Sequence, residues 1–157
     1  MGTAAATATI DAPIGLVWDV MIDTAAYPEW NPFIVRVDLL DGPKPALGRR
    51  VRLHVRWDSG GSAKATERIT ALDAPADGRA RLDYDYGGPI AALGLVRGRR
   101  RQELIANDDG TTTYETDETL RGLLSWSAPL AKVQNGFERH AGALKARAES
   151  LHAAASA

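Results

Sequence analysis

The spacing of hydrophobic residues changes twice along the chain. Between residues 14 and 21 apolar side chains recur every three or four positions, which predicts a short amphipathic helix. Between residues 33 and 120 apolar and polar side chains alternate, which is typical of strands with one buried face. From residue 130 to 151 the helical spacing returns as one continuous stripe, which predicts a long C-terminal helix.

Turn residues divide these regions into elements. Pro28 and Pro32 end a second short helix, predicted over 23–30, because proline lacks an N–H group and restricts the residue before it. Asn107 to Gly110 is a strong hairpin signal between the last two strands. The predicted strands span residues 7–10, 33–39, 51–57, 64–72, 82–86, 96–105 and 112–120.

This order of elements predicts an α+β fold. Strands that follow one another in hairpins form an antiparallel sheet of about seven strands, and the long helix must cover it. A strongly curved sheet around such a helix leaves an internal cavity, where small apolar ligands bind. We expect one domain over residues 1–157, with a core at about 8–151 and frayed termini. The mostly apolar segment from Ile90 to Leu95 is predicted to fold over the cavity as a lid.

Composition excludes several functions. The 157 residues contain 19 Lys and Arg against 20 Asp and Glu, so no net positive charge favours nucleic acid. No apolar run is long enough to cross a membrane, and no signal peptide is recognisable, so we expect a cytoplasmic protein without membrane insertion. Cysteine is absent and the three histidines lack ligand spacing, so we expect neither metal nor cofactor.

Polar residues on the last two predicted strands are the candidates for chemistry. Strand alternation, with Leu104 and Leu120 facing inward, directs Arg100, Gln102, Thr116 and Glu118 to the interior. Buried charges need partners, so one interpretation is an ion pair between Arg100 and Glu118. In another, Arg100 holds a ligand carbonyl or enolate oxygen and Glu118 acts as a general base. In a third, a one-residue bulge turns these side chains outward.

Further candidates lie on neighbouring elements. Glu67 shares an inward face of its strand and is expected either to reach the cavity or to form a rim ion pair. Tyr84, Tyr86 and Tyr114 have apolar bodies and a hydroxyl group, which suits pocket walls as well as plain sheet packing.

On the long helix, Phe137 lies within the buried stripe and is expected to contact a ligand. Gln134 lies at the edge of the stripe, where it reaches either the ligand or the backbone.

Several segments resemble one known superfamily. They are Ile10 to Trp18, Tyr27 to Phe33, Glu118 to Gly122 and Phe137 to Glu149, and the resemblance runs from about Ala8 to Leu151. In this order they resemble the START-like, or SRPBCC, superfamily, and within it the polyketide cyclase/dehydrase-like branch. The resemblance implies a helix-grip fold with a deep hydrophobic pocket. Within the Tyr27 to Phe33 segment, Trp30 is expected either to line the pocket mouth or to seal the short helices against the sheet.

The resemblance implies a ligand class and leaves the activity open. Members include lipid carriers, plant-hormone receptors, pollen allergens, chaperone activators and polyketide aromatase/cyclases, so the fold alone fixes no reaction. We expect a hydrophobic, aromatic or polyketide-like ligand whose cyclisation or dehydration is promoted by Arg100 and Glu118 without a cofactor. The alternatives are a non-catalytic carrier of a lipid or hydrophobic metabolite and a protein-interaction module that uses the outer sheet face. The chain is expected to be a monomer or a homodimer.

Overall fold

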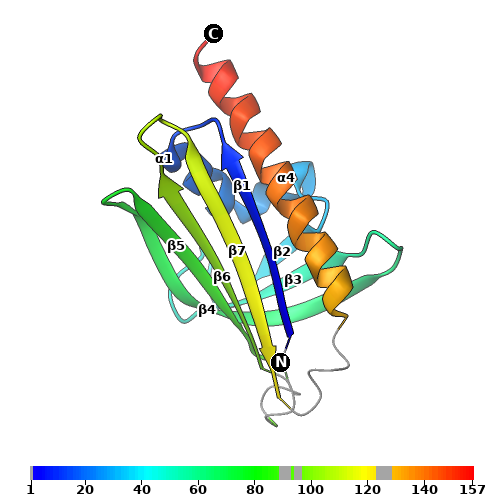
Figure 1. Ribbon diagram of the computed structural model, residues 1–157. Helices are drawn as coiled ribbons and strands as arrows, with labels where there is room; N and C mark the ends of the chain where they lie inside the picture. The colour runs from blue at the N-terminus through cyan, green and yellow to red at the C-terminus, as the bar shows by residue number, and fades with distance from the viewer. Residues whose placement is uncertain (1, 89–92, 94–96, 123–128) are drawn as a thin grey trace.

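The computed structural model describes residues 2–88, 93, 97–122 and 129–157. It confirms the predicted α+β class, with a curved antiparallel sheet around a long C-terminal helix (Figure 1). The helical elements are α1 (Ile14–Ile22), the 3-10 turn η1 (Thr24–Ala26), α2 (Tyr27–Trp30) and α4 (Leu130–Ala155). The strands are β1 (Gly2–Ile10), β2 (Ile34–Leu39), β3 (Arg50–Arg56), β4 (Ser62–Ala76), β5 (Arg79–Tyr86), β6 (Arg97–Ala106) and β7 (Thr112–Arg121).

The sheet order is β1-β7-β6-β5-β4-β3-β2, so strands β2 to β7 form sequential hairpins and β1 pairs with β7. Register shifts occur between β2 and β3 and between β4 and β5. Strands β6 and β7 pair without a shift, and Arg100 lies directly opposite Glu118. Alternation therefore continues unbroken along the two strands that carry the polar candidates, and the bulge considered for them is absent.

The turn between β6 and β7 shows why the hairpins form where they do. Gly110 has a φ of 85°, a backbone conformation that side chains with a Cβ rarely adopt. The Asp109 carboxylate accepts hydrogen bonds from the backbone N–H and the hydroxyl of Thr111. Local side-chain bonds of this kind stabilise tight turns and align the following strand.

The core lies between the concave face of the sheet and the helices. Large buried side chains come from β5 to β7 and from α4, with Leu82, Leu104, Tyr114, Phe137 and Leu144 almost completely shielded from solvent. Helix α1 contacts both the sheet and α4 and closes one end of this layer. The other end of the layer contains the cavity described below.

Strand β1 extends further than the sequence pattern predicted. Its Ala- and Thr-rich sequence lacks the large alternating apolar residues that mark the other strands, so only 7–10 were expected. Side chains of α4 bond to its open edge. The Gln134 amide donates to the carbonyl of Ala5 at 2.7 Å and accepts from its N–H at 2.9 Å, while Lys145 donates to the carbonyl of Thr9. The helix therefore takes the place of a neighbouring strand.

Other boundaries also differ from the prediction. Strand β4 continues through Ala76, past a register shift opposite β5, instead of ending at residue 72. Helix α4 reaches Ala155, although a frayed tail was expected from residue 153. The segment predicted as a lid lies outside the described residues except for Leu93, which is exposed. Within the described residues, no helix is long and apolar enough to cross a membrane.

Candidate functional site

A cavity of about 300 Å³ lies between the concave face of the sheet and the first turns of α4. Its walls are mainly apolar and come from strands β2 to β7 and α4 and from the residues beside them. The apolar lining residues are Phe33, Ile34, Leu53, Val55, Trp57, Ala63, Ala65, Leu120, Pro129, Val133 and Phe137. The polar lining residues are Glu67, Tyr86, Arg100 and Glu118.

The aromatic wall depends on a close approach of α4 to the segment before β2. Phe33 packs edge to face against Phe137, with ring centroids 6.1 Å apart, and its centroid lies 5.9 Å from that of Trp57. A Cβ at Gly136 would overlap the ring of Phe33. Glycine at this helical position therefore allows the Phe33 ring to lie directly against the helix backbone and to form one side of the cavity.

Arg100 is the only permanent cation among the described cavity-lining residues, and its side chain is 4% exposed. Its Nε donates to Thr116 Oγ1 at 3.2 Å, and one terminal nitrogen lies 3.5 Å from the Tyr114 hydroxyl. The guanidinium carbon lies 4.4 Å from the centroid of the Phe137 ring, a cation–π arrangement. Strand register and ring stacking thus hold the guanidinium in one place.

No carboxylate in the described part of the chain forms an ion pair with Arg100. The ion pair with Glu118 considered from the sequence is therefore not formed, although the two residues face each other across β6 and β7. The remaining donors of a buried guanidinium need an acceptor. The cavity beside Arg100 is where a ligand oxygen would supply one.

Two carboxyl groups share the cavity wall with Arg100. Glu67 Oε2 is shielded from solvent and has no hydrogen-bond partner among the described residues. Burial raises the pKa of Glu67 to about 8; the charge of Glu118 acts in the same direction and that of Arg100 opposes both. Burial also raises the pKa of Glu118, against the opposing effect of Arg100. At neutral pH, Glu67 is therefore mostly a neutral acid able to donate a hydrogen bond.

Gly98 provides the space for the Glu118 carboxyl group. A Cβ at this position would lie 3.0 Å from Glu118 Oε1 and 3.0 Å from Leu120 Cδ2. The absence of a side chain on β6 therefore keeps the carboxyl group at the cavity wall instead of displacing it.

Four of the other predicted site residues are buried on the strands around Arg100 and do not line the cavity. Tyr114 donates its hydroxyl hydrogen to Gln102 Oε1 at 2.9 Å, and Thr116 donates to the carbonyl of Arg101 at 3.0 Å. Tyr84 lies directly opposite Arg100 in the sheet. Thr116 and Tyr114 bond Arg100 directly, and Gln102 bonds Tyr114.

Trp30 and Gln134, predicted as ligand-binding, lie away from the cavity. Trp30 packs against Tyr27, with centroids 5.1 Å apart, and against His140 at 5.7 Å, so it seals the short helices. Gln134 bonds both polar groups of the Ala5 backbone and also Glu138. Both side chains use their polar or aromatic groups within the fold. Arg100, Glu118, Glu67, Tyr86 and Phe137 are the predicted residues that the structure does bring together at the cavity.

His140 was not among the predicted site residues, yet it is fully buried beside this network. Asn31 Oδ1 accepts from the N–H groups of Phe33 and Ile34, so Asn31 Nδ2 donates to His140 Nδ1 at 2.9 Å. The proton of His140 is then on Nε2, which has no partner among the described residues. Burial, with a smaller effect from Arg100, lowers the pKa of His140 well below 6.5. The sequence did contain one signal for its burial, because His140 lies three residues after Phe137 and residues three apart share one side of a helix.

The cavity suits polar reactions of a small organic molecule. It offers a fixed cation, a neutral acid and a second carboxyl group within an apolar enclosure, where electrostatic interactions are stronger than in water. No cluster of three potential metal ligands occurs among the described residues.

Comparisons with known proteins agree with this architecture. The fold superimposes on a START superfamily protein from Mycobacterium smegmatis, with a TM-score of 0.70 and 21% identity over 95% of this chain and 98% of that chain. It also matches major latex-like protein 151 from Panax ginseng, with a TM-score of 0.70 and 15% identity over 96% and 97% of the two chains. These similarities support the fold alone.

A curated relative is oxopyrrolidines biosynthesis cluster protein O from Penicillium oxalicum, 28% identical over 87% of this chain and 77% of the relative. A family model described as polyketide cyclase / dehydrase and lipid transport matches residues 1–149. The match includes every strand of the sheet and most of α4. The chain therefore belongs to the polyketide cyclase / dehydrase and lipid transport family, and its fold is START-like.

Proposed function

We propose that the protein binds a small hydrophobic molecule, aromatic or polyketide-like, in the cavity and promotes its cyclisation or dehydration. The observation that supports this most is Arg100, a buried cation at the cavity wall with no carboxylate partner among the described residues. A purely structural arginine would be expected to pair with Glu118, which faces it across the sheet. The unpaired arrangement favours a ligand oxygen as the missing partner.

The cavity volume limits the ligand. At about 300 Å³ it is at the lower end of the range of roughly 300–1,000 Å³ found for small-molecule sites. A compact molecule of one or two rings fits this space better than a long acyl chain. The name of the relative from Penicillium oxalicum, which refers to oxopyrrolidine biosynthesis, supports a small carbonyl-containing compound.

A dehydration would use the three polar groups together. Arg100 stabilises negative charge on a ligand carbonyl oxygen while the Glu118 carboxylate takes a proton from the adjacent carbon. The carbon–oxygen bond to a β-hydroxyl group then breaks, and Glu67 in its acid form supplies the proton that lets this group leave as water. Glu118 finishes protonated and Glu67 ionised, so one proton returns from the first to the second before the next cycle.

The first experiment is native mass spectrometry of the purified protein, before and after denaturation. We expect a retained compound of a few hundred daltons, or displacement of a fluorescent hydrophobic probe by compact aromatic carbonyl compounds. An empty protein that binds no probe at this cavity would overturn the proposal. Turnover of the identified compound by the parent protein, its loss in Glu118→Gln and its retention in Glu115→Gln would establish catalysis, because Glu115 is exposed on the same strand.

A second candidate function is binding without catalysis, as in a carrier. The predominance of apolar residues in the cavity wall favours it. In that case the Glu118→Gln variant would bind the compound as tightly as the parent protein does. Neither protein would change the mass of the compound.

A further inference from the structure

The outer face of β5, β6 and β7, on the opposite side of the sheet from the cavity, contains a second hollow of about 570 Å³. It is lined by charged side chains, namely five arginines and three aspartates, together with Gly98 and Thr119. Although the whole chain has a net charge of −1, this groove carries two more positive than negative side chains. We call it the outer groove.

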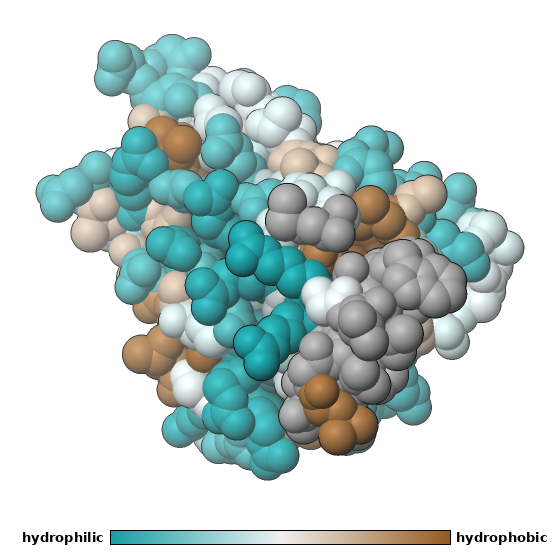
Figure 2. Space-filling view, turned by 60° about the horizontal axis from the view of Figure 1, so that its bottom comes forward, coloured by the Kyte–Doolittle hydropathy of each residue, from teal (hydrophilic) through white to brown (hydrophobic). Residues whose placement is uncertain are grey.

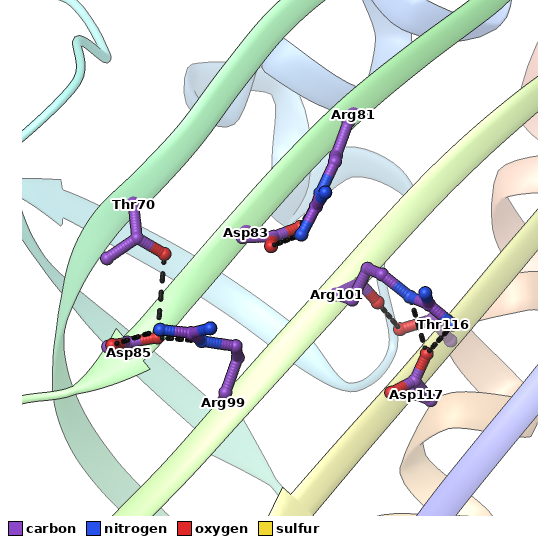
Figure 3. Close-up of polar contacts among 8 residues, drawn as sticks. All are labelled: Thr70, Arg81, Asp83, Asp85, Arg99, Arg101, Thr116 and Asp117. Atoms are coloured by element: carbon purple, nitrogen blue, oxygen red, sulfur yellow. Dashed lines mark hydrogen bonds and ion pairs between the residues drawn. The ribbon is translucent and has the colours of Figure 1, made fainter.

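Each aspartate of the outer groove already has an arginine partner (Figure 3). Within β5, Arg81 pairs with Asp83. From β6, Arg99 reaches Asp85 on β5 at 2.8 Å and Arg101 reaches Asp117 on β7 at 2.8 Å. These ion pairs occupy all the carboxylates that line the groove.

The two remaining arginines, Arg97 and Arg121, lie directly opposite each other on β6 and β7. Both are exposed, and neither has a carboxylate partner in the described part of the chain. Residues 89–96 and 123–128, which flank them in sequence, contain no Asp or Glu. Like charges at directly opposite positions of a sheet are destabilising, so an anion between them would stabilise the fold.

Figure 2 shows the end of the molecule at which β6 begins and β7 ends, with hydrophilic side chains gathered across the middle of the view. Arginine side chains present N–H donors in a planar fork that matches the oxygens of phosphate. We propose that Arg97 and Arg121 form a binding site for a phosphoryl group on the outer face of the sheet. The guanidinium of Arg99, two residues along β6 on the same face, is also exposed but is paired with Asp85.

Isothermal titration of the full chain with inorganic phosphate at low ionic strength tests the site. We expect saturable binding at one site per chain, weakened about tenfold or more in the Arg97→Gln/Arg121→Gln double variant, because each charge-assisted hydrogen bond lost costs about one factor of ten. The matched control is Arg52→Gln/Lys64→Gln, which removes the same charge from exposed positions on β3 and β4. It should bind phosphate within about twofold of the parent protein, since only screened long-range attraction changes.

Vesicles distinguish the source of the phosphoryl group. Co-sedimentation with phosphatidylcholine vesicles containing phosphatidic acid, lost in Arg97→Gln/Arg121→Gln, would identify a phospholipid headgroup. Phosphate binding without co-sedimentation would identify a soluble phosphate ester. Absence of both interactions in the parent protein, or equal weakening in the variant and in its control, would overturn the proposal. Retention of hydrophobic probe binding by the double variant separates this outcome from any failure of the cavity proposal.

Discussion

Strands β5, β6 and β7 carry arginines and carboxylates on both faces but pair them differently. On the outer face, Arg99 and Arg101 each bond an aspartate on a neighbouring strand, in contact with solvent. Arg100, which lies between Arg99 and Arg101 in the sequence, is buried on the inner face. Neither of the carboxyl groups near it, those of Glu67 and Glu118, forms an ion pair with it in the described part of the chain. Adjacent residues of one strand therefore have opposite electrostatic environments.

The difference indicates which charges serve the fold and which serve a ligand. Exposed ion pairs contribute about 0–1 kcal/mol each, because water competes for both partners. Buried ionisable groups without partners cost stability, so they persist where another molecule supplies the partner. Substitutions on the two faces should therefore separate ligand binding from folding.

The largest expected effect comes from Arg100→Met. Ligand or probe affinity should fall by a factor of about 10 to 100, the usual cost of losing hydrogen bonds from a charged group. The fold should persist, because Met keeps apolar volume and the partners of Arg100 retain other bonds, Tyr114 to Gln102 and Thr116 to a backbone carbonyl. Fluorescence titration and urea denaturation measure the two quantities. Arg99→Met, on the opposite face, is the matched control, and equal affinity losses in both would remove the distinction between the faces.

The next largest effect should be on stability, in a comparison of two glycines of α4, Gly136 and Gly142. Gly136→Ala places a methyl group where the Phe33 ring lies, which should cost about 1–3 kcal/mol of unfolding free energy and alter the cavity wall. Gly142→Ala on the same helix meets no atom within 4 Å and should stabilise the protein by up to about 1 kcal/mol. Chemical denaturation of both variants provides the comparison. Similar stability changes in the two would show that Phe33 does not need the space at Gly136.

Glu67 should give the inner face a dependence on pH. Its pKa in the folded protein, about 8, is above the ordinary 4.5, so its stabilising contribution is complete at low pH and is lost as the pH rises through 8. Glu67→Gln should therefore become progressively more stable than the parent protein between about pH 5 and pH 8, by less than roughly 1.4 kcal/mol per pH unit.

Urea denaturation across this pH range measures the stability difference at each pH. His140 acts in the opposite direction below about pH 6.5, since its pKa is lowered in the fold, but it is present in both proteins and cancels. The exposed Glu115→Gln serves as the control. A difference between Glu67→Gln and the parent protein that is constant with pH would mean that Glu67 is ionised throughout.

The smallest effect is expected on the outer face. Asp117→Asn removes the carboxylate that Arg101 bonds at 2.8 Å and should change the unfolding free energy by less than about 0.5 kcal/mol. Hydrophobic probe affinity should not change. A loss above about 1 kcal/mol, measured by urea denaturation, would show that the outer ion pairs form a cooperative network and that the two faces differ less than we infer.

The sequence predicted those features that depend on spacing and missed those that depend on side-chain conformation. Alternation placed Arg100 and Glu118 on the inner face and paired them across two strands. It did not show that the Arg100 side chain turns toward Thr116 and Phe137 instead of Glu118, since that choice is made by packing. The alternating sequence indicated an apolar face on β2 and β3. It contained no local signal that this face would form a wall of the cavity.

Weak local signals explain the other differences. Ala-rich β1 is stabilised by pairing with β7 and by side chains of α4 that are more than a hundred residues away in the sequence. The local sequence therefore did not indicate the full length of this strand. The same long-range bonds place Gln134 on the sheet edge. His140 was considered from the sequence only as a metal ligand, and its bond to Asn31, more than a hundred residues away, had no local signal.

The bonds between α4 and β1 bear on self-association. Residues Gly2 to Ile10 contain neither proline nor charge, the two devices that usually prevent an edge strand from pairing with another molecule. In this chain, Gln134 and Lys145 occupy the backbone groups of Ala5 and Thr9 that such a neighbour would use. Release of α4 would therefore uncover a template for intermolecular strand addition, so the helix that forms one wall of the cavity also protects the protein from aggregation.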